Sequence, residues 1–195
     1  MDKKIGLFWL RDDFRLIKNY GLIEATTNHE EVVVFYLYKK DAYKDQEAQK
    51  WWLSKSLLNF KKQLNNLNIN LEIIETNSFK IFFDKLIKKK DFAIYWNKVY
   101  EPDYLKFDQY LFTVFKNQNI KHKRFKGNAL NEIEEINKSD GTPFKVFTPF
   151  WRTAEKYYIE KIPSKNKIIK KCKKKINFLK NCVEPEKILP KKKMF

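Results

Sequence analysis

Two charged loops contain the residues of this sequence that could bind a ligand. The first is Arg11-Asp12-Asp13-Phe14-Arg15, in the segment that follows the apolar run at residues 4–9. Two guanidinium groups and two carboxylates around one ring could hold a polar ligand at the end of a strand. For Arg11, Asp13 and Arg15 we favour pairing within the fold, because charges in a buried loop usually find partners. No nucleophile–base pair or metal-ligand cluster is evident, so catalysis by this chain alone is not expected.

The order of apolar segments predicts the framework that carries these loops. β-Branched and aromatic runs predict five strands, at residues 4–9, 31–37, 69–75, 91–96 and 120–125. Periodic apolar positions predict helices between them, at residues 20–28, 46–66, 79–86 and 102–117. This alternation predicts a Rossmann-like α/β fold, an open five-stranded parallel sheet with helices on both faces. The chain lacks a Gly-x-Gly-x-x-Gly motif, which argues against a glycine-rich dinucleotide site.

In such a sheet, the first loop and the loop at residues 97–103 both follow the carboxyl ends of strands. Trp51 and Trp52 stand near the start of the helix at residues 46–66. Adjacent residues cannot share the centre of one helical stripe, so we expect one indole in the core and the other at a cleft.

After residue 127 the alternation stops. Phe144 to Arg152 is aromatic and is expected to be extended, followed by a helix from Thr153 to Lys161. Pro149 excludes a central strand there. The predicted division is an α/β domain at residues 1–130, a segment at 131–162 that closes it, and a basic linker at 163–195.

Composition restricts the class of protein. The net charge is +17, and residues 164–195 carry ten of these charges because they contain twelve Lys and two Glu. We attribute most of this charge to a Lys- and Asn-rich composition, although a basic tail could also contact nucleic acid weakly. Cys172 and Cys182 are expected to be free thiols. No apolar run is long enough to span a bilayer or act as a signal peptide, so a cytoplasmic monomer is expected.

Four ordered segments resemble motifs of the photolyase/cryptochrome family. Residues 7–16 are similar to its opening Trp-x-Arg-x-Asp-Leu-Arg motif, and residues 49–57 resemble its Trp-Trp-Leu helix. Residues 96–102 are similar to its Trp-Asn-x-x-Tyr-Glu-Pro loop, and residues 141–152 to its Val-Phe-Thr-Pro-Phe-Trp segment. On these motifs the chain is identified as a member of that family, through its N-terminal α/β domain.

The resemblance implies part of a deoxyribodipyrimidine photolyase, a lyase that repairs pyrimidine dimers in DNA with light. In that family a flavin adenine dinucleotide (FAD) lies in a following helical domain, where the flavin donates an electron to a dimer flipped out of DNA. The chain ends at Phe195, so we expect the FAD and lesion sites to be missing and the isolated chain to be inactive. The implied partners are the C-terminal helical FAD domain and, through it, damaged DNA. The lesion, a cyclobutane dimer or a 6-4 product, stays open.

Two alternatives of other classes stay open. One is a cryptochrome-type photoreceptor domain, since the same α/β domain occurs there. The other is a free-standing module that binds a chromophore or nucleic acid.

Many family members bind a second, light-harvesting chromophore in the α/β domain. The resemblance and the predicted sheet edge together imply the cofactor-binding residues Arg11, Asp13, Phe35, Leu37, Lys50, Trp51, Trp52, Glu101 and Asp103. The chromophore is left undecided between a deazaflavin, a flavin and a folate. Asp103 and Tyr104 stand where folate-binding relatives carry Asn and Glu, which argues against folate, and Asp12 replaces an Arg of the family's Arg-Arg-Asp.

Overall fold

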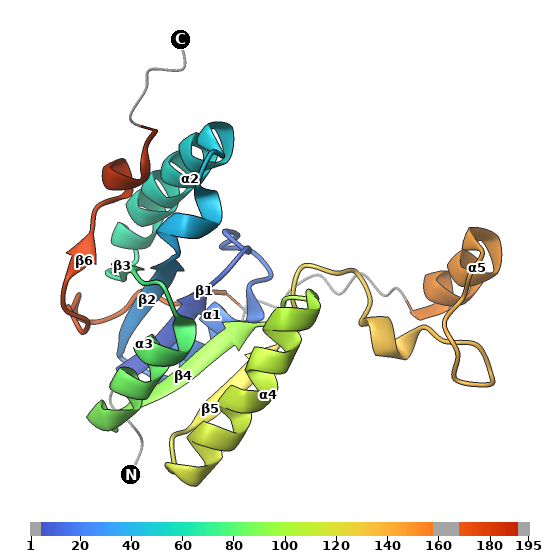
Figure 1. Ribbon diagram of the computed structural model, residues 1–195. Helices are drawn as coiled ribbons and strands as arrows, with labels where there is room; N and C mark the ends of the chain where they lie inside the picture. The colour runs from blue at the N-terminus through green and yellow to red at the C-terminus, as the bar shows by residue number, and fades with distance from the viewer. Residues whose placement is uncertain (1–4, 158–167, 191–195) are drawn as a thin grey trace.

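The structure, a computed structural model, describes residues 5–157 and 168–190 and is built on one sheet (Figure 1). The strand order is β5-β4-β1-β2-β3-β6. The strands are β1 (Ile5–Leu10), β2 (Glu31–Tyr38), β3 (Asn70–Glu75), β4 (Phe92–Asn97), β5 (His122–Phe125) and β6 (Cys182–Val183). All neighbouring strands pair in parallel except β3 and β6, which are antiparallel.

Within residues 5–157 and 168–190, four helices cover the sheet and a fifth lies apart from it. They are α1 (Tyr20–Asn28), α2 (Glu47–Asn65), α3 (Phe79–Leu86), α4 (Pro102–Asn117) and α5 (Phe147–Tyr157). Short 3-10 turns are η1 (Lys40–Tyr43), η2 (Ile87–Lys89), η3 (Ile133–Glu135) and η4 (Pro185–Ile188). The crossovers place α1 and α2 on one face and α3 and α4 on the other.

Side-chain alternation along the central strands explains these two layers. On β1, Phe8 points toward the α1 and α2 layer, whereas Leu7 and Trp9 point toward α3 and α4. A strand that is covered on both sides must be apolar at every position, which is the pattern of β1, β2 and β4. The Rossmann-like parallel α/β fold predicted from the sequence is therefore confirmed.

The structure adds a sixth strand to the predicted five, and it comes from the tail. Residues 168–190, which belong to the predicted linker, pack along the edge of the sheet, where Cys172 and Ile188 are buried. The carboxylate of Glu72 accepts hydrogen bonds of 2.7 Å from the backbone amides of Phe178 and Leu179. The apolar residues that anchor this segment are spaced among lysines, so their density was too low to predict a core contribution.

The aromatic segment at residues 144–152 is not extended throughout, as the sequence suggested. Helix α5 begins at Phe147, and Pro149 lies in its first turn, where the missing amide of proline costs no hydrogen bond. In the described residues α5 ends at Tyr157, and the predicted continuation to Lys161 lies outside them. Figure 1 shows α5 (orange) projecting away from the sheet.

Candidate functional site

A pocket of about 710 Å³ lies at the carboxyl edge of β1 and β2. Its walls include the rings of Trp9, Tyr36, Tyr43, Phe79 and Tyr104. The parallel register of β1 with β2 brings the ends of these two strands together, so the first charged loop and η1 face the same space. The sequence analysis predicted that the two charged loops lie at this edge of the sheet.

Arg11 is the buried cation of the pocket. Its guanidinium lies 3.9 Å from the centre of the Trp9 ring and 5.2 Å from that of Tyr104. Its NH1 and NH2 nitrogens bind the carboxylate of Asp108 on α4. The Nε donor is buried and has no hydrogen-bond partner among the described residues. Burial lowers the pKa of Arg11, and the bond to Asp108 partly offsets that effect.

Asp108 is fully buried and joins three elements. It accepts hydrogen bonds from Arg11 on one side and from Arg124 NH1, at 3.0 Å, on the other. Trp96 Nε1 donates a third bond, of 3.1 Å, to Oδ1. A buried carboxylate with this many donors is fully satisfied, so it holds both guanidiniums in place.

The mouth of the pocket carries charge of the opposite sign. Asp12 and Glu101 line it, and both are exposed to solvent. The pocket is therefore positive at its buried wall and negative at its entrance.

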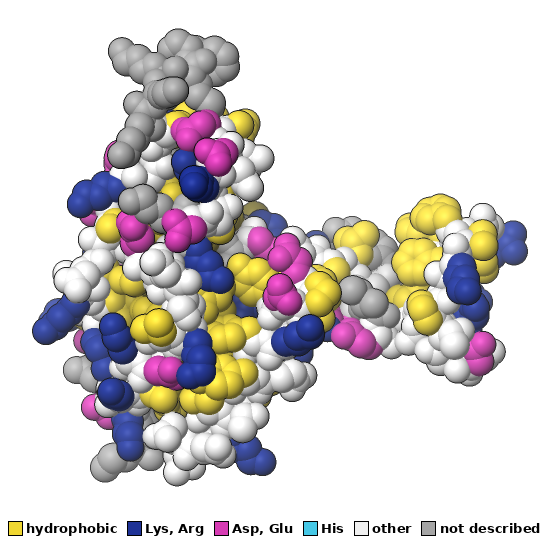
Figure 2. Space-filling model, viewed as in Figure 1, with side chains coloured by type: hydrophobic (Ala, Val, Ile, Leu, Met, Phe, Trp, Pro, Cys, Tyr) yellow, Lys and Arg dark blue, Asp and Glu magenta, His cyan; other side chains and the backbone are white. Residues whose placement is uncertain are grey.

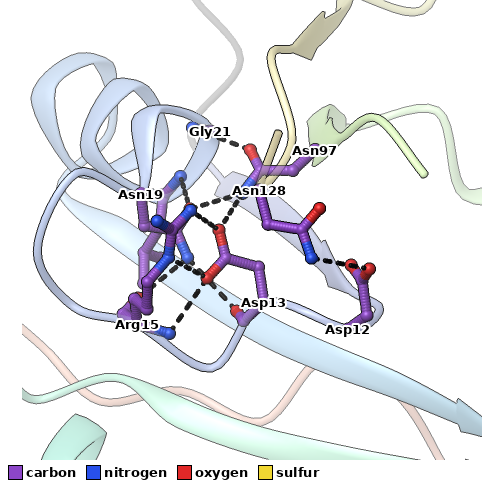
Figure 3. Close-up of polar contacts among 8 residues, drawn as sticks. Asp12, Asp13, Arg15, Asn19, Gly21, Asn97 and Asn128 are labelled. Carbon is purple, nitrogen blue, oxygen red and sulfur yellow. Dashed lines mark hydrogen bonds and ion pairs between the residues drawn. The ribbon is translucent and has the colours of Figure 1, made fainter. Parts of the chain in front are cut away.

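A second polar network holds the first charged loop in place (Figure 3). The Asp13 carboxylate pairs with Arg15, with Nε–Oδ1 at 2.7 Å, and accepts a bond of 3.2 Å from Asn97. Asn97 Oδ1 in turn accepts a hydrogen bond of 3.1 Å from the backbone amide of Gly21. A Cβ at Gly21 would lie 2.6 Å from the Asn97 Oδ1, so this close approach requires glycine. The favoured interpretation that these loop charges pair within the fold is borne out for Arg11, Asp13 and Arg15, although Arg11 pairs with a helix.

Lys98 ties the following segment to the pocket loop. Its buried ammonium binds Glu132, the residue before η3, at 2.9 Å and Glu134, within η3, at 2.8 Å. Tyr100 donates a bond of 2.9 Å to Glu132. The chain passes so close at Gly127 that a Cβ there would lie 2.1 Å from the Lys98 carbonyl oxygen. The contacts of Lys98 and Tyr100 therefore hold the segment that leads to α5 against the loop that carries Glu101.

The structure brings together only part of the predicted site. Arg11, Leu37 and Glu101 line the pocket, whereas Asp13 braces its loop. Phe35 lies in the core and stacks on Trp9, with ring centres 6.4 Å apart. The remaining predicted positions are Lys50, which pairs with Glu47, and the exposed Trp51, Trp52 and Asp103. Their contact with a chromophore stays a prediction.

The expectation that one of the two tryptophans fills the core is wrong. Trp51 is 38% exposed and Trp52 66% exposed, and their rings meet edge to face at 5.1 Å. The buried stripe of α2 consists of Ser54, Leu57, Phe60 and Leu64. Both indoles precede this stripe and are not part of it.

Sequence reasoning missed Tyr43, Tyr104, Asp108 and Arg124. A signal for Asp108 existed, because it lies three and seven residues before the buried Leu111 and Phe115 and thus on the same face of α4. A carboxylate on an apolar stripe indicates a buried cationic partner. Which cation it would bind could not be read from spacing.

Within the described residues, no helix combines the length and the apolar character that crossing a membrane would need. Cys172 is buried and Cys182 exposed, and both are free thiols, as predicted.

Comparisons with known proteins agree on one family. The model of the DNA photolyase family matches residues 6–167. The deoxyribodipyrimidine photo-lyase of Agrobacterium fabrum is 28% identical over 149 residues, which are 76% of this chain and 31% of that protein. Its counterpart in Alkalihalophilus pseudofirmus is 30% identical over 151 residues, 74% of this chain and 31% of that protein. The chain thus spans about a third of the length of these relatives.

Solved structures share the fold. A class III photolyase from Agrobacterium tumefaciens superposes with a TM-score of 0.78 at 24% identity, covering 96% of this chain and 39% of that one. An archaeal photolyase from Sulfolobus tokodaii, described with two FAD molecules, gives 0.70 at 18% identity, covering 94% and 40%. A cryptochrome from Synechocystis gives 0.71 at 19% identity, with the same two coverages. Because the family model matches most of the chain, this protein belongs to the DNA photolyase family, with the fold of its N-terminal α/β domain.

Proposed function

We propose that the chain is the N-terminal domain of a deoxyribodipyrimidine photolyase and that it holds a light-harvesting chromophore in the pocket beside Arg11. The observation that carries this proposal is an aromatic-lined pocket of about 710 Å³ with the Arg11 side chain in its wall. Family membership supplies the reason to expect a conjugated ring there.

The shape and charge of the pocket suit a flat ring with an uncharged polar chain. The rings of Trp9 and Tyr104 offer surfaces on which a conjugated system can pack. Asp12 and Glu101 at the mouth can accept hydrogen bonds from hydroxyl groups and would repel carboxylates. A flavin or deazaflavin carries a sugar-alcohol chain, whereas a folate carries a glutamate tail. We therefore propose a flavin or deazaflavin ring with an uncharged sugar-alcohol chain, because the diphosphate of an FAD would meet the same repulsion as a carboxylate.

We propose that the chain binds a helical FAD domain and that α5 forms the contact surface. Val146 and Phe147, at the start of this helix, are 63% and 70% exposed, and Trp151 is 44% exposed. Figure 2 shows hydrophobic side chains gathered at the α5 end of the molecule. A projecting helix with such a face is typical of an interaction surface. The relatives extend for about twice this length beyond the matched part, which leaves room for such a domain.

In this proposal the chain does not catalyse repair alone. The flavin of the helical domain supplies the electron that splits the dimer, and damaged DNA binds at that domain. The residues described here would hold and orient the chromophore and keep water from its ring.

Titration of the purified chain with chromophores tests this function. We expect riboflavin or a deazaflavin to bind with quenched fluorescence, because Trp9 and Tyr104 lie in the pocket wall, and methenyltetrahydrofolate to bind more weakly. Tyr104→Ala should weaken binding, whereas the matched control Tyr110→Ala, on the same helix but outside the pocket lining, should not. If none of these rings binds, the chromophore function is refuted.

The proposed partner has its own test. The C-terminal part of the Agrobacterium fabrum photolyase, added in trans, should bind the chain in sedimentation experiments. Phe147→Ser with Trp151→Ser should abolish this binding, and Ile81→Ser, at another exposed apolar side chain, should leave it unchanged. Equal binding by all three chains would refute the role of α5.

A further inference from the structure

We propose that lysines of the tail form a binding surface for the phosphate backbone of duplex DNA, at the end of the sheet opposite the pocket. This surface, the lysine ridge, consists of Lys170, Lys171, Lys173, Lys174 and Lys175. All five residues are exposed. The proposal rests on the tail alone, so it does not depend on a chromophore in the pocket.

The tail crosses the amino-terminal edge of the sheet. Within the ridge, the backbone amide of Lys173 donates a hydrogen bond of 3.2 Å to the carbonyl of Glu30, the residue before β2. Just beyond the ridge, the ring of Phe178 meets that of Phe92, the first residue of β4, with centres 6.0 Å apart. The pocket lies at the carboxyl ends of β1 and β2, so the two surfaces occupy opposite ends of the strands.

Hydrogen bonds hold the backbone of the ridge against the body of the protein. The amide of Lys170 donates a bond of 3.1 Å to Oγ1 of Thr26 on α1. The amide of Cys172 donates one of 2.8 Å to the carbonyl of Leu67, and its own carbonyl accepts one of 3.0 Å from Nδ2 of Asn68. A backbone that is already held in place loses less conformational entropy on binding than a free tail would.

Apolar side chains among the lysines anchor the same segment. Ile169 and Cys172 pack against the core layer of α1 and α2, and Ile176 packs against the layer of α3 and α4. Because these anchors face the body, the lysines between them lie on the solvent side. The ridge is therefore a fixed row of cations rather than a random basic tail.

The body neutralises only part of this charge. Lys173 pairs with Glu30, and the ammonium of Lys175 donates a hydrogen bond of 2.7 Å to Oδ1 of Asn65. Within residues 5–157 and 168–190, three members of the ridge have no ion-pair partner, namely Lys170, Lys171 and Lys174. Like charges held this close repel one another, so an anionic partner would stabilise the arrangement.

The type and spacing of the charges suit a phosphodiester backbone. From Lys170 to Lys175 the chain can span at most about 17 Å, a length over which one strand of a duplex carries about five phosphates. The ammonium of lysine is a point charge that contacts phosphates without reading base edges. The match to the DNA photolyase family favours DNA over RNA or a lipid surface as the polyanion.

Two variants of equal net charge test the ridge. The ridge variant replaces the three lysines without an ion-pair partner, as Lys170→Gln, Lys171→Gln and Lys174→Gln. The matched control removes the same charge from exposed lysines elsewhere, as Lys106→Gln, Lys116→Gln and Lys138→Gln. Binding of each chain to a short, fluorescently labelled duplex of undamaged DNA is measured by anisotropy at several salt concentrations.

We expect the wild type to bind weakly, with an affinity that falls steeply between about 50 and 200 mM salt. Each lost phosphate contact lowers the slope of log K against log salt by about 0.9, so the ridge variant should lose about 2.7 of that slope. At about 50 mM salt its affinity should be at least about tenfold lower, whereas the control should keep the wild-type slope to within about 0.5. A duplex irradiated to form dimers should bind no more tightly, because phosphate contacts do not read bases.

Three results would overturn the proposal. Equal losses of slope in the two variants would mean that net charge alone explains the binding. Absence of DNA binding by the wild type at about 50 mM salt would leave the ridge without this function. Tighter binding to phosphatidylglycerol vesicles than to the duplex would make a lipid surface the partner. Circular dichroism verifies the fold of each chain, and none of these results depends on whether riboflavin binds in the pocket.

Discussion

Asn97 Nδ2 donates a hydrogen bond of 2.9 Å to Oδ1 of Asn19, although 78 residues separate them in the chain. Asn19 caps α1, since its Oδ1 also accepts the amide of Leu22 at 3.2 Å. Asn97 ends β4, next to β1 in the sheet. One amide pair therefore fixes the start of α1 against the end of β4, and with it the loop that presents Arg11.

Asn97→Ala should destabilise the fold by about 2–3 kcal/mol, because it removes the acceptor of the buried Gly21 amide and the donor that Asn19 and Asp13 share. Urea unfolding followed by circular dichroism measures this change. The matched control is Asn128→Ala, which removes an exposed bond of 3.3 Å to Asp12 and should cost less than about 0.5 kcal/mol. Equal losses in the two variants would contradict the structural role of Asn97.

Glu72 should make attachment of the tail depend on pH. Burial raises its pKa above the ordinary 4.5, and the bonds from the amides of Phe178 and Leu179 only partly offset this. A carboxyl with a raised pKa holds its proton longer in the folded state, so its contribution to stability falls as the pH rises through the window above 4.5.

Glu72→Gln removes this titration, so the variant should gain stability relative to the wild type between about pH 4 and pH 7. Urea unfolding of both chains across that range is the measurement. The control, Glu155→Gln on the exposed face of α5, should follow the wild type at every pH. A difference between Glu72→Gln and the wild type that shrinks or stays constant with rising pH would be inconsistent with this assignment.

Trp9 and Trp52 should contribute differently to stability, because one is buried and the other is exposed. Trp9 is 1% exposed and packs against Phe83 with ring centres 4.9 Å apart, so Trp9→Ala should cost about 3–5 kcal/mol. Trp52 is largely exposed, and Trp52→Ala should change stability by less than about 0.5 kcal/mol. Thermal unfolding of the two variants tests this, and a large loss in Trp52→Ala would mean that the indole packs against the body.

Lys98 should control the ionisation of Glu134. The hydrogen bond from the Lys98 ammonium holds the pKa of Glu134 below its ordinary value, so this pair stabilises the fold above that value and ceases to do so as the pH falls through the lowered pKa. Lys98→Met should let the pKa of Glu134 rise. Carbon-13 NMR titration of the glutamate carboxyl groups measures it, with Lys138→Met, at an exposed lysine of the same segment, as control. An unchanged Glu134 titration in Lys98→Met would contradict this pairing.

The sequence alone determined the layered sheet. The central strands are apolar at consecutive positions, which is a local property, and it requires helices on both faces. Helix α4 runs from Pro102 to Asn117 as its pattern indicated, and Ser78 caps α3 with its side chain. Burial patterns and caps depend on residues a few positions apart, so they can be recognised from the sequence alone. The family motifs were legible for the same reason.

The tertiary structure decided which residues meet. Asp108 and Arg11 are 97 residues apart, and only the packing of α4 beside β1 brings their charges together. The exposure of Trp51 and Trp52 depends on where the α2 stripe meets the sheet, which no local pattern specifies. The tail joins the core because β3 leaves an edge open to pairing with β6. Contacts of this kind arise between segments distant in the chain, so the pocket and the Arg11–Asp108 pair in its wall emerged only from the folded arrangement.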